Sequence, residues 1–378
     1  MDGNRLTNAF LFVLAIVAIA TVLRVASTVF LPLAVAILLS FVFSPVVGFL
    51  HRLKIPRVVG IIIVILFLLT LGFLVGLVLY SSSQSLLREF PVYQERFTTL
   101  VAQVIERFDL PEDILDQLEI GQAIRGAALE VSGNLVSFLS GFTLVVIFLL
   151  FVLLEEPYLR AKLLDAVQGR ATRKVTIMIA HINQQVSRYL VVKFLISALT
   201  AGTVFVAYLV IGVDFPFIWL VLTFLFNFIP SIGSIAITII ASIFALVQFL
   251  PDWNYVILAA GAMAMTQLLI GNILDPQLLG ERLNLSPVVI LLSLLLWGYI
   301  WGVMGMFIAV PITGAIKITF ENIPSTRPIG VMMGTGQWRR KRKRRKGGGQ
   351  SGDAGPPEDP GDQGGLPPES GDRTERAE

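Results

Sequence analysis

The stretch NFIPSIGSIAITIIASIFAL, residues 227–246, lies in the most apolar half of the chain and opens on an interruption. Pro230 removes a backbone donor and clashes with the preceding helical turn, and Gly233 loosens the backbone further. In hydrocarbon, a freed backbone group has no water to bond. The pattern predicts a helix broken at membrane depth. Two explanations stay open: a functional break whose freed backbone groups face a solute, or a kink or short loop that neighbouring helices repair.

The rest of the composition places this break in a membrane protein. Of the 378 residues, 55% are hydrophobic and 15% are charged, whereas soluble proteins have roughly a quarter charged residues. Several apolar runs reach the ~20 residues that cross ~30 Å of hydrocarbon. We therefore expect an all-α, polytopic helical membrane protein of about eight spans, with a broken or re-entrant helix pair. The absence of cysteine from the sequence excludes disulfides and thiolate metal sites.

Basic loops predict the orientation of the spans. The segments 51–57 (HRLKIPR) and 155–188 are rich in Lys and Arg, as cytoplasmic loops are. The apolar runs 8–23 and 30–43 follow each other closely and suggest a tight membrane hairpin. The third run, 58–80, then leads out of the cell.

An amphipathic segment is expected outside the membrane after this third span. Its apolar residues recur at helical spacing, and Phe90-Pro91 suits a helix start because proline is favoured in a first turn. The predicted organisation is 1–80 for three spans, 81–137 for the outside helices, 138–189 for the fourth span and a basic linker, 190–324 for a transport core with the broken helix, and 325–378 for a cytoplasmic tail.

The tail carries eight consecutive basic residues, which predict contact with anionic lipid on the cytoplasmic side. They are Arg339, Arg340, Lys341, Arg342, Lys343, Arg344, Arg345 and Lys346. Both termini are thus expected in the cytoplasm. With both termini on one side, the number of membrane crossings must be even. This leaves open whether 215–250 crosses once or is re-entrant. In the second case the last apolar stretch, 288–320, must cross twice or re-enter as well.

A second polar stretch, GNILDPQLLGERL at 271–283, also allows two interpretations. Intramembrane carboxylates usually serve ion or proton pathways, and Asn272 and Asp275 share a helix face if the helix continues. Alternatively, Asp275 caps a helix that begins at Pro276, as Ser286 would before Pro287. The cap is favoured, although the two interpretations can coexist. Charges near other span ends, including Lys193 and Lys317, are expected to reach the interface by snorkelling.

Several chemistries have no support in the sequence. No phosphate-binding loop, HExxH or His/carboxylate cluster occurs. Ser231 and Ser234 lack a histidine partner at a matching depth, which disfavours a serine protease. We therefore expect no enzyme, no metal, no cofactor and no nucleic-acid partner.

Three stretches carry a family resemblance: FLFNFIPSIGS (224–234), the run from GNILDPQLLGERL to WGVMGM (271–306), and FIAVPITGAIKI (307–318). The chain resembles the autoinducer-2 exporter family of bacterial membrane proteins over about residues 6–324. The resemblance implies about eight spans, a homo-oligomer with a pentamer as one form, and export of autoinducer-2 or, for some members, sodium or lithium/proton antiport. It places Asn227, Pro230 and Gly233 on one family motif, and Asn272, Asp275, Pro276 and Gly280 on another.

The sequence thus predicts a secondary transporter or permease of the bacterial inner membrane that exports a small polar solute such as autoinducer-2. The expected partners are that solute, a proton or monovalent cation, membrane lipids and further copies of the chain. The candidate pathway residues are Asn227, Pro230, Ser231, Gly233, Ser234, Gln267 and Asn272, with Asp275 as candidate ion or proton site. The alternatives are a sodium(lithium)/proton antiporter and a membrane scaffold that acts through its tail and outside helices.

Overall fold

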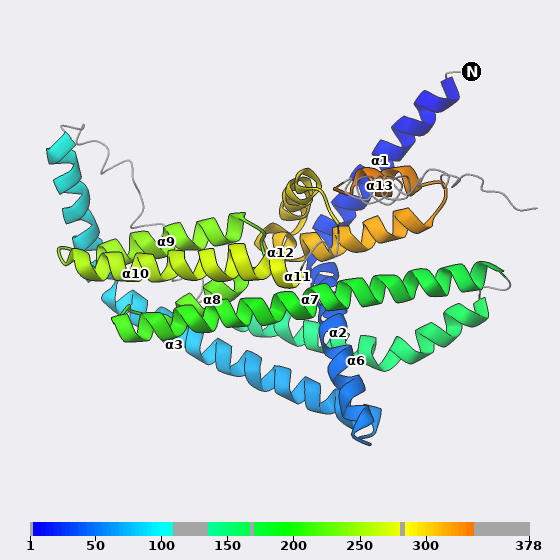
Figure 1. Ribbon diagram of the computed structural model, residues 1–378, viewed down its shortest axis with the longest axis horizontal. Helices are drawn as coiled ribbons and strands as arrows, with labels where there is room; N and C mark the ends of the chain where they lie inside the picture. Colours follow the sequence, from blue (N-terminus) through cyan, green and yellow to red (C-terminus); the bar gives the residue numbers. More distant parts are fainter. Residues whose placement is uncertain (1–2, 109–134, 167–169, 280–283, 336–378) are drawn as a thin grey trace, which may run out of the picture. The chain divides into compact units, whose positions relative to one another are not determined.

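The computed structural model describes residues 3–108, 135–166, 170–279 and 284–335, which are helical apart from short links and one isolated β-bridge (Figure 1). The helices are α1 (Gly3–Val25), α2 (Ser27–Arg52), α3 (Arg57–Phe108), α6 (Leu135–Ala166), α7 (Arg170–Ile211), α8 (Pro216–Phe226), α9 (Ile232–Phe249), α10 (Trp253–Thr266), the π-helix η1 (Gln267–Leu274), α11 (Asp275–Leu279), α12 (Pro287–Asn322) and α13 (Arg327–Met332).

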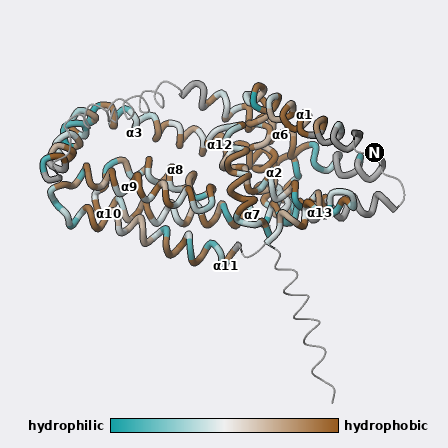
Figure 2. The backbone as a smooth tube through the Cα atoms, turned by 90° about the horizontal axis from the view of Figure 1, so that it is seen from above, coloured by the Kyte–Doolittle hydropathy of each residue, from teal (hydrophilic) through white to brown (hydrophobic). Residues whose placement is uncertain are grey.

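Long hydrophobic stretches dominate these helices (Figure 2). In the described residues, seven helices are long and apolar enough to cross a membrane, and two shorter ones, Val13–Val25 and Pro216–Phe226, are also apolar. The prediction of an all-α, polytopic helical membrane protein is therefore confirmed.

The third span does not end where the sequence suggested. Helix α3 runs unbroken through 52 residues, and Pro91 lies inside it instead of at a helix start. The helix continues because its second half buries an apolar face, which includes Phe90 and Ile105 and brings Tyr93 within 5.5 Å of the Phe244 ring on α9. The rest of the predicted outside segment, from residue 109 to 134, falls outside the described residues.

The first two apolar runs do not form the expected tight hairpin. Only Ala26 separates α1 from α2, and hydrogen bonds continue across it, from Ala26 N to the Val22 carbonyl (2.9 Å) and from Phe30 N to the Ala26 carbonyl (3.0 Å). A single residue with these bonds cannot reverse the chain, so α1 leads into α2 (Figure 1).

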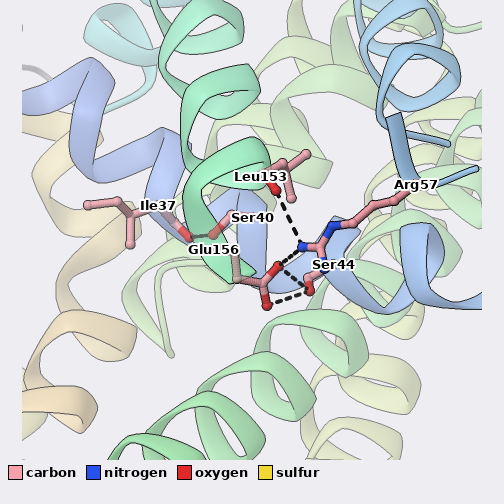
Figure 3. A network of polar contacts seen from close by, with 6 residues as sticks. All are labelled: Ile37, Ser40, Ser44, Arg57, Leu153 and Glu156. Carbon is pink, nitrogen blue, oxygen red and sulfur yellow. Dashed lines mark hydrogen bonds and ion pairs between the residues drawn. The ribbon is translucent and has the colours of Figure 1, made fainter. Parts of the chain in front are cut away.

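Helices α2, α3 and α6 share an apolar core that ends in a polar network. Ala36, Ile61 and Leu149 are buried in this core. Glu156 on α6 accepts hydrogen bonds from Ser44 on α2 (3.1 Å) and from Arg57 at the start of α3 (2.8 Å) (Figure 3). This network holds three helices together at one end of the core.

The chain folds back on itself between Gly212 and Gln248, and we call this stretch the first folded-back segment. Helix α8 leads away from the link after α7, a turn follows, and α9 returns. The Gln248 side chain accepts from Asp214 N (3.0 Å) and donates to the Gly212 carbonyl (2.9 Å), so both ends of the segment meet. With ~1.5 Å per residue, the 11 residues of α8 cover only ~16 Å, about half of a bilayer core. Helix α8 is therefore too short to cross by itself, whereas the 18 residues of α9 are long enough to do so.

A second folded-back segment extends from Ser286 to Met333. Its helix, α12, turns sharply at Trp301 and Gly302, both of which have non-helical backbone angles. The Ser286 amide donates to the Met333 carbonyl at 2.9 Å, so this segment also returns to its start. The predicted cap is confirmed here, since Ser286 Oγ accepts from the Val289 amide at 3.3 Å, and Pro287 opens the helix.

The two folded-back segments contact each other at the turn of the first. Ile229 is buried together with Leu294 and Ala309, which lie on either side of the α12 turn. The rings of Phe228 and Phe307 are 5.8 Å apart. The polar turn of the first segment is therefore fixed by apolar contacts with the second.

Glycine is required at one position in each turn, because a backbone carbonyl occupies the space of a side chain. A Cβ on Gly233 would lie 1.8 Å from the Phe226 carbonyl oxygen, and a Cβ on Gly305 would lie 1.9 Å from that of Trp297. Neither contact can be relieved by turning a side chain. Both turns therefore depend on backbone-to-backbone packing.

We predict that Gly233→Ala and Gly305→Ala each lower the thermal unfolding midpoint of the purified protein in detergent by several degrees, since overpacking typically costs ~1–3 kcal/mol. Gly261→Ala is the matched control, because nothing lies within 4 Å of its Cβ position. Its midpoint should stay unchanged or rise slightly. Equal midpoints for all three variants would contradict the turn geometry.

Candidate functional site

The turn between α8 and α9 lies where the sequence predicted the break. Helix α8 ends at Phe226 and α9 begins at Ile232. The freed amides do not face a solute, however. Those of Asn227, Phe228 and Ile229 bond to carbonyls three or four residues earlier, and Gly233 N donates to the Ile229 carbonyl at 3.1 Å. Of the two explanations left open by the sequence, these positions fit a short turn, because their amides are satisfied locally.

Asn227 attaches this turn to α7. Its side chain is 4% exposed, and Nδ2 donates to Ser197 Oγ at 3.1 Å and to Thr200 Oγ1 at 3.4 Å. Both partners on α7 are fully buried. The amide thus joins two helical elements across the core.

The other predicted residues of the turn differ in their exposure. Gly233 is buried against the α8 carbonyl, Pro230 is half-buried, and Ser231 is exposed. Ser231 has a left-handed backbone with φ of 59°, which is uncommon for a non-glycine residue. Ser234 Oγ donates to the Ser231 carbonyl at 3.0 Å. Of these residues, Asn227 alone contributes a buried polar side chain.

The second predicted stretch contains a buried ion pair. Lys193 Nζ on α7 lies 2.6 Å from Asp275 Oδ2, with side chains 4% and 16% exposed. The snorkelling prediction for Lys193 is wrong, because its ammonium is in the interior beside a carboxylate. Breaking such a pair by removing one partner costs about 3–5 kcal/mol, since the other charge stays buried.

The cap interpretation of Asp275 is also wrong. Helices α10, η1 and α11 follow each other without a break, and Asp275 has helical backbone angles. Pro276 therefore lies within a continuous helical path, where its ring clashes with the carbonyl four residues earlier. The π-helix Gln267–Leu274 ends just before it, and the Asp275 amide bonds to the Ile270 carbonyl, five residues earlier.

Gln267, at the start of the π-helix, is a buried amide without a hydrogen-bond partner in the described residues. It is 5% exposed, and both Nε2 and Oε1 are unpaired. Asp275 Oδ1 and Thr223 Oγ1 are likewise buried and unpaired. Buried polar atoms are bonded in the great majority of cases, so these atoms mark a place where a polar ligand could bind. Asn272, in contrast, is exposed.

One face of α7 connects these features. Lys193, Ser197 and Thr200 are spaced i, i+4 and i+7, which places them on one side of a helix. Lys193 holds Asp275, whereas the next two residues hold Asn227 one to two turns further on. Gln267 opens the π-helix that leads to Asp275, and this π-helix also packs against α7. We call Lys193, Ser197, Thr200, Asn227, Gln267 and Asp275 the α7 polar face.

Sequence reasoning missed three members of the α7 polar face. The sequence predicts an interface position for Lys193, and nothing in a single apolar run points to a partner for Ser197 and Thr200. The available signal was the i, i+4, i+7 spacing of polar residues within the apolar run 190–211.

Other predicted sites are not tested by this geometry. The basic residues 339–346 fall outside the described residues. In the described ranges, no group of three or more His, Asp and Glu side chains could hold a metal ion. Lys317 is a second buried lysine, paired with Glu321 at 2.8 Å, and it too does not snorkel.

We predict that Asp275→Asn and Lys193→Met each destabilise the protein by about 3–5 kcal/mol, because each leaves one buried charge alone. The double variant should recover most of the loss, since it removes both charges. Chemical unfolding of the purified protein measures all four states of this cycle. Additive losses in the double variant would contradict a coupled pair.

Comparison with known proteins agrees with this architecture. The sequence matches the family described as "AI-2E family transporter" over residues 10–325. It is 32% identical over 330 residues to a proposed transport protein of Borreliella burgdorferi, covering 87% of this chain and 91% of the relative. It is 30% identical over 322 residues to the AI-2 transport protein TqsA of Escherichia coli K12, covering 82% and 91%. The proposed transport protein YhhT of the same strain is 29% identical, covering 85% and 93%. A match of this extent identifies the chain as a member of the AI-2E transporter family.

Proposed function

We propose that this protein is a secondary transporter of the bacterial inner membrane that exports a small polar solute such as autoinducer-2. The family and the transport names of the bacterial relatives support the class. The solute is suggested by one of them, TqsA, whose name gives AI-2 transport. The observation that carries the proposal is the α7 polar face, which has buried polar atoms without partners beside the turn of a folded-back segment.

The α7 polar face offers a solute both donors and acceptors. Gln267 contributes an unpaired Nε2 and Oε1, and Thr223, one helical turn before Asn227 on α8, adds an unpaired hydroxyl next to this face. Asn227 already donates to two hydroxyls on α7, so a passing solute must replace those bonds. Transporters commonly bind substrates at broken helices near the bilayer midplane. The turn at Asn227 therefore separates from α7 when the solute passes.

The charges of the α7 polar face favour an uncharged solute. Lys193 and Asp275 neutralise each other at 2.6 Å. A cation attracted to the carboxylate would be repelled by the adjacent ammonium, and an anion attracted to the ammonium would be repelled by the carboxylate. Both repulsions are strong in a medium of low dielectric constant. The sodium(lithium)/proton alternative requires Asp275 to release Lys193 before it can bind a cation.

The proposal places both termini in the cytoplasm, the basic residues 339–346 on anionic lipid and several copies of the chain in one assembly. Many large apolar side chains are exposed on the isolated chain, including Val210 and Leu295 at 83% and 70%. Lipid tails and neighbouring copies would cover such side chains.

The test is flux of autoinducer-2 and a panel of small neutral polyols from proteoliposomes that contain the purified protein. We expect release of at least one of these solutes above that from protein-free vesicles. Gln267→Leu should reduce the release by about tenfold or more, because its amide no longer bonds the solute; a factor of ten corresponds to ~1.4 kcal/mol. Its unfolding midpoint should not fall, since no hydrogen bond in the described structure is lost.

Gln277→Leu is the matched control, because Gln277 is exposed on α11. Its flux should equal that of the wild type. No release of any tested solute, or equal release by the Gln267 and Gln277 variants, would contradict the proposed pathway.

A further inference from the structure

The ion pair of Asp275 with Lys193 limits the cations that can bind at this carboxylate. A carboxylate in a poorly solvated site requires a proton, a metal cation or a basic side chain. Here the Lys193 ammonium occupies that place at 2.6 Å, and its side chain is 4% exposed. A short charge-assisted hydrogen bond of this kind is among the strong ones.

A dissolved alkali cation competes poorly with this ammonium. Lys193 is fixed to α7, so it binds Asp275 without the loss of free translation that a dissolved ion undergoes. A hard cation also prefers several oxygen ligands around one point. In the described residues, the nearest buried and unpaired side-chain acceptor on another residue of this helical path is Gln267 Oε1, eight positions away, which is ~12 Å at ~1.5 Å per residue. One ion cannot contact both oxygens, so Gln267 does not help a cation to displace Lys193.

The second buried lysine of the chain shows why this arrangement is special. Lys317 is as buried as Lys193, at 4% exposure, but its partner Glu321 is 36% exposed. If Lys317 were removed, water could solvate the Glu321 carboxylate. If Lys193 were removed, Asp275 would keep a buried charge without a counter-ion. The two lysines therefore form a natural comparison.

We propose that Lys193 is a built-in counter-cation that excludes Na⁺ and Li⁺ from Asp275 and makes the protein independent of alkali cations. The inference rests on the proposed function, because it states which cations that transporter does not need. Lys193 determines ion specificity because its ammonium occupies the Asp275 carboxylate, which is the one negative charge of the α7 polar face.

The test measures thermal unfolding of the purified full-length protein in detergent, at constant pH and ionic strength. Sodium or lithium chloride is compared with N-methyl-D-glucamine chloride, whose organic cation is much larger than either metal ion. The wild-type midpoint should be the same in all three salts. Lys193→Met should unfold at a lower temperature and gain several degrees in sodium or lithium, because a ligand that binds only the folded state stabilises it.

Two controls separate ion binding from a purely structural role of the pair. Lys193→Met/Asp275→Asn should lose the response to sodium and lithium, because no carboxylate remains. Lys317→Met should show no response, because Glu321 is accessible to water. Lys193→Gln provides the same measurement with a polar side chain if the methionine variant does not fold.

A second measurement uses the wild type alone. Uptake of radioactive ²²Na⁺ into proteoliposomes should equal that of protein-free vesicles. Wild-type uptake that Asp275→Asn abolishes, or a wild-type midpoint that rises in sodium, would overturn the inference. The absence of a sodium response in both folded Lys193 variants would also overturn it.

These outcomes are distinguishable from a failure of the proposed function. Solute flux is not part of either measurement. If the Lys193 variants respond to sodium as expected while no solute is released from proteoliposomes, the transport proposal fails and the role of Lys193 stands. If solute release is observed but sodium stabilises the wild type, only the role of Lys193 fails.

Discussion

The arrangement of the core depends on the cost of burying polar groups in an apolar helix bundle. Lys193 and Asp275 are both largely removed from water, and neither charge is tolerated there without the other. Their contact fixes the position of the η1–α11 helical path along α7. One turn further, Ser197 and Thr200 receive the Asn227 amide and fix the turn between α8 and α9 on the same helix face. Helix α7 is thus a common support for the η1–α11 path and for the turn between α8 and α9.

The irregular backbone that α7 supports lies in the two folded-back segments. In each segment, a glycine packs on a backbone carbonyl seven or eight residues earlier, which lets the chain reverse within a few residues. The backbone groups of the first turn are largely satisfied within it, so the polar surface offered to a ligand comes from side chains. Gln267 and Thr223 keep polar atoms without partners, and such atoms destabilise a fold unless something else uses them. A binding site is a physical reason to retain them.

Much of the fold could be predicted from the sequence. Apolar run lengths identified the spans, and Pro230 with Gly233 located the turn, because these residues have local effects that context does not reverse. Ser286 was predicted as a cap for the same reason. Errors arose where tertiary packing decided the outcome: Pro91 lies within a helix because the following turns bury an apolar face, and Ala26 does not reverse the chain.

The site was harder to predict because its residues come from separate elements. A lysine within an apolar run is compatible with snorkelling until a carboxylate from another helix lies beside it. Asp275 before Pro276 has the pattern of a cap, and only the continuous π-winding excludes this interpretation. The pairing of Asn227 with Ser197 and Thr200 depends on the antiparallel course of α8 and α7, which spacing within one helix does not determine.

The central claim is that the turn at Asn227 must leave α7 for a solute to pass. The natural chain has no cysteine, so Ser197→Cys/Asn227→Cys would carry the only two thiols. The most direct measurement is solute flux from proteoliposomes before cross-linking, after joining these thiols with a short reducible reagent, and after reduction. The account predicts that flux stops on cross-linking and returns on reduction. Unchanged flux through the cross-linked protein would contradict it.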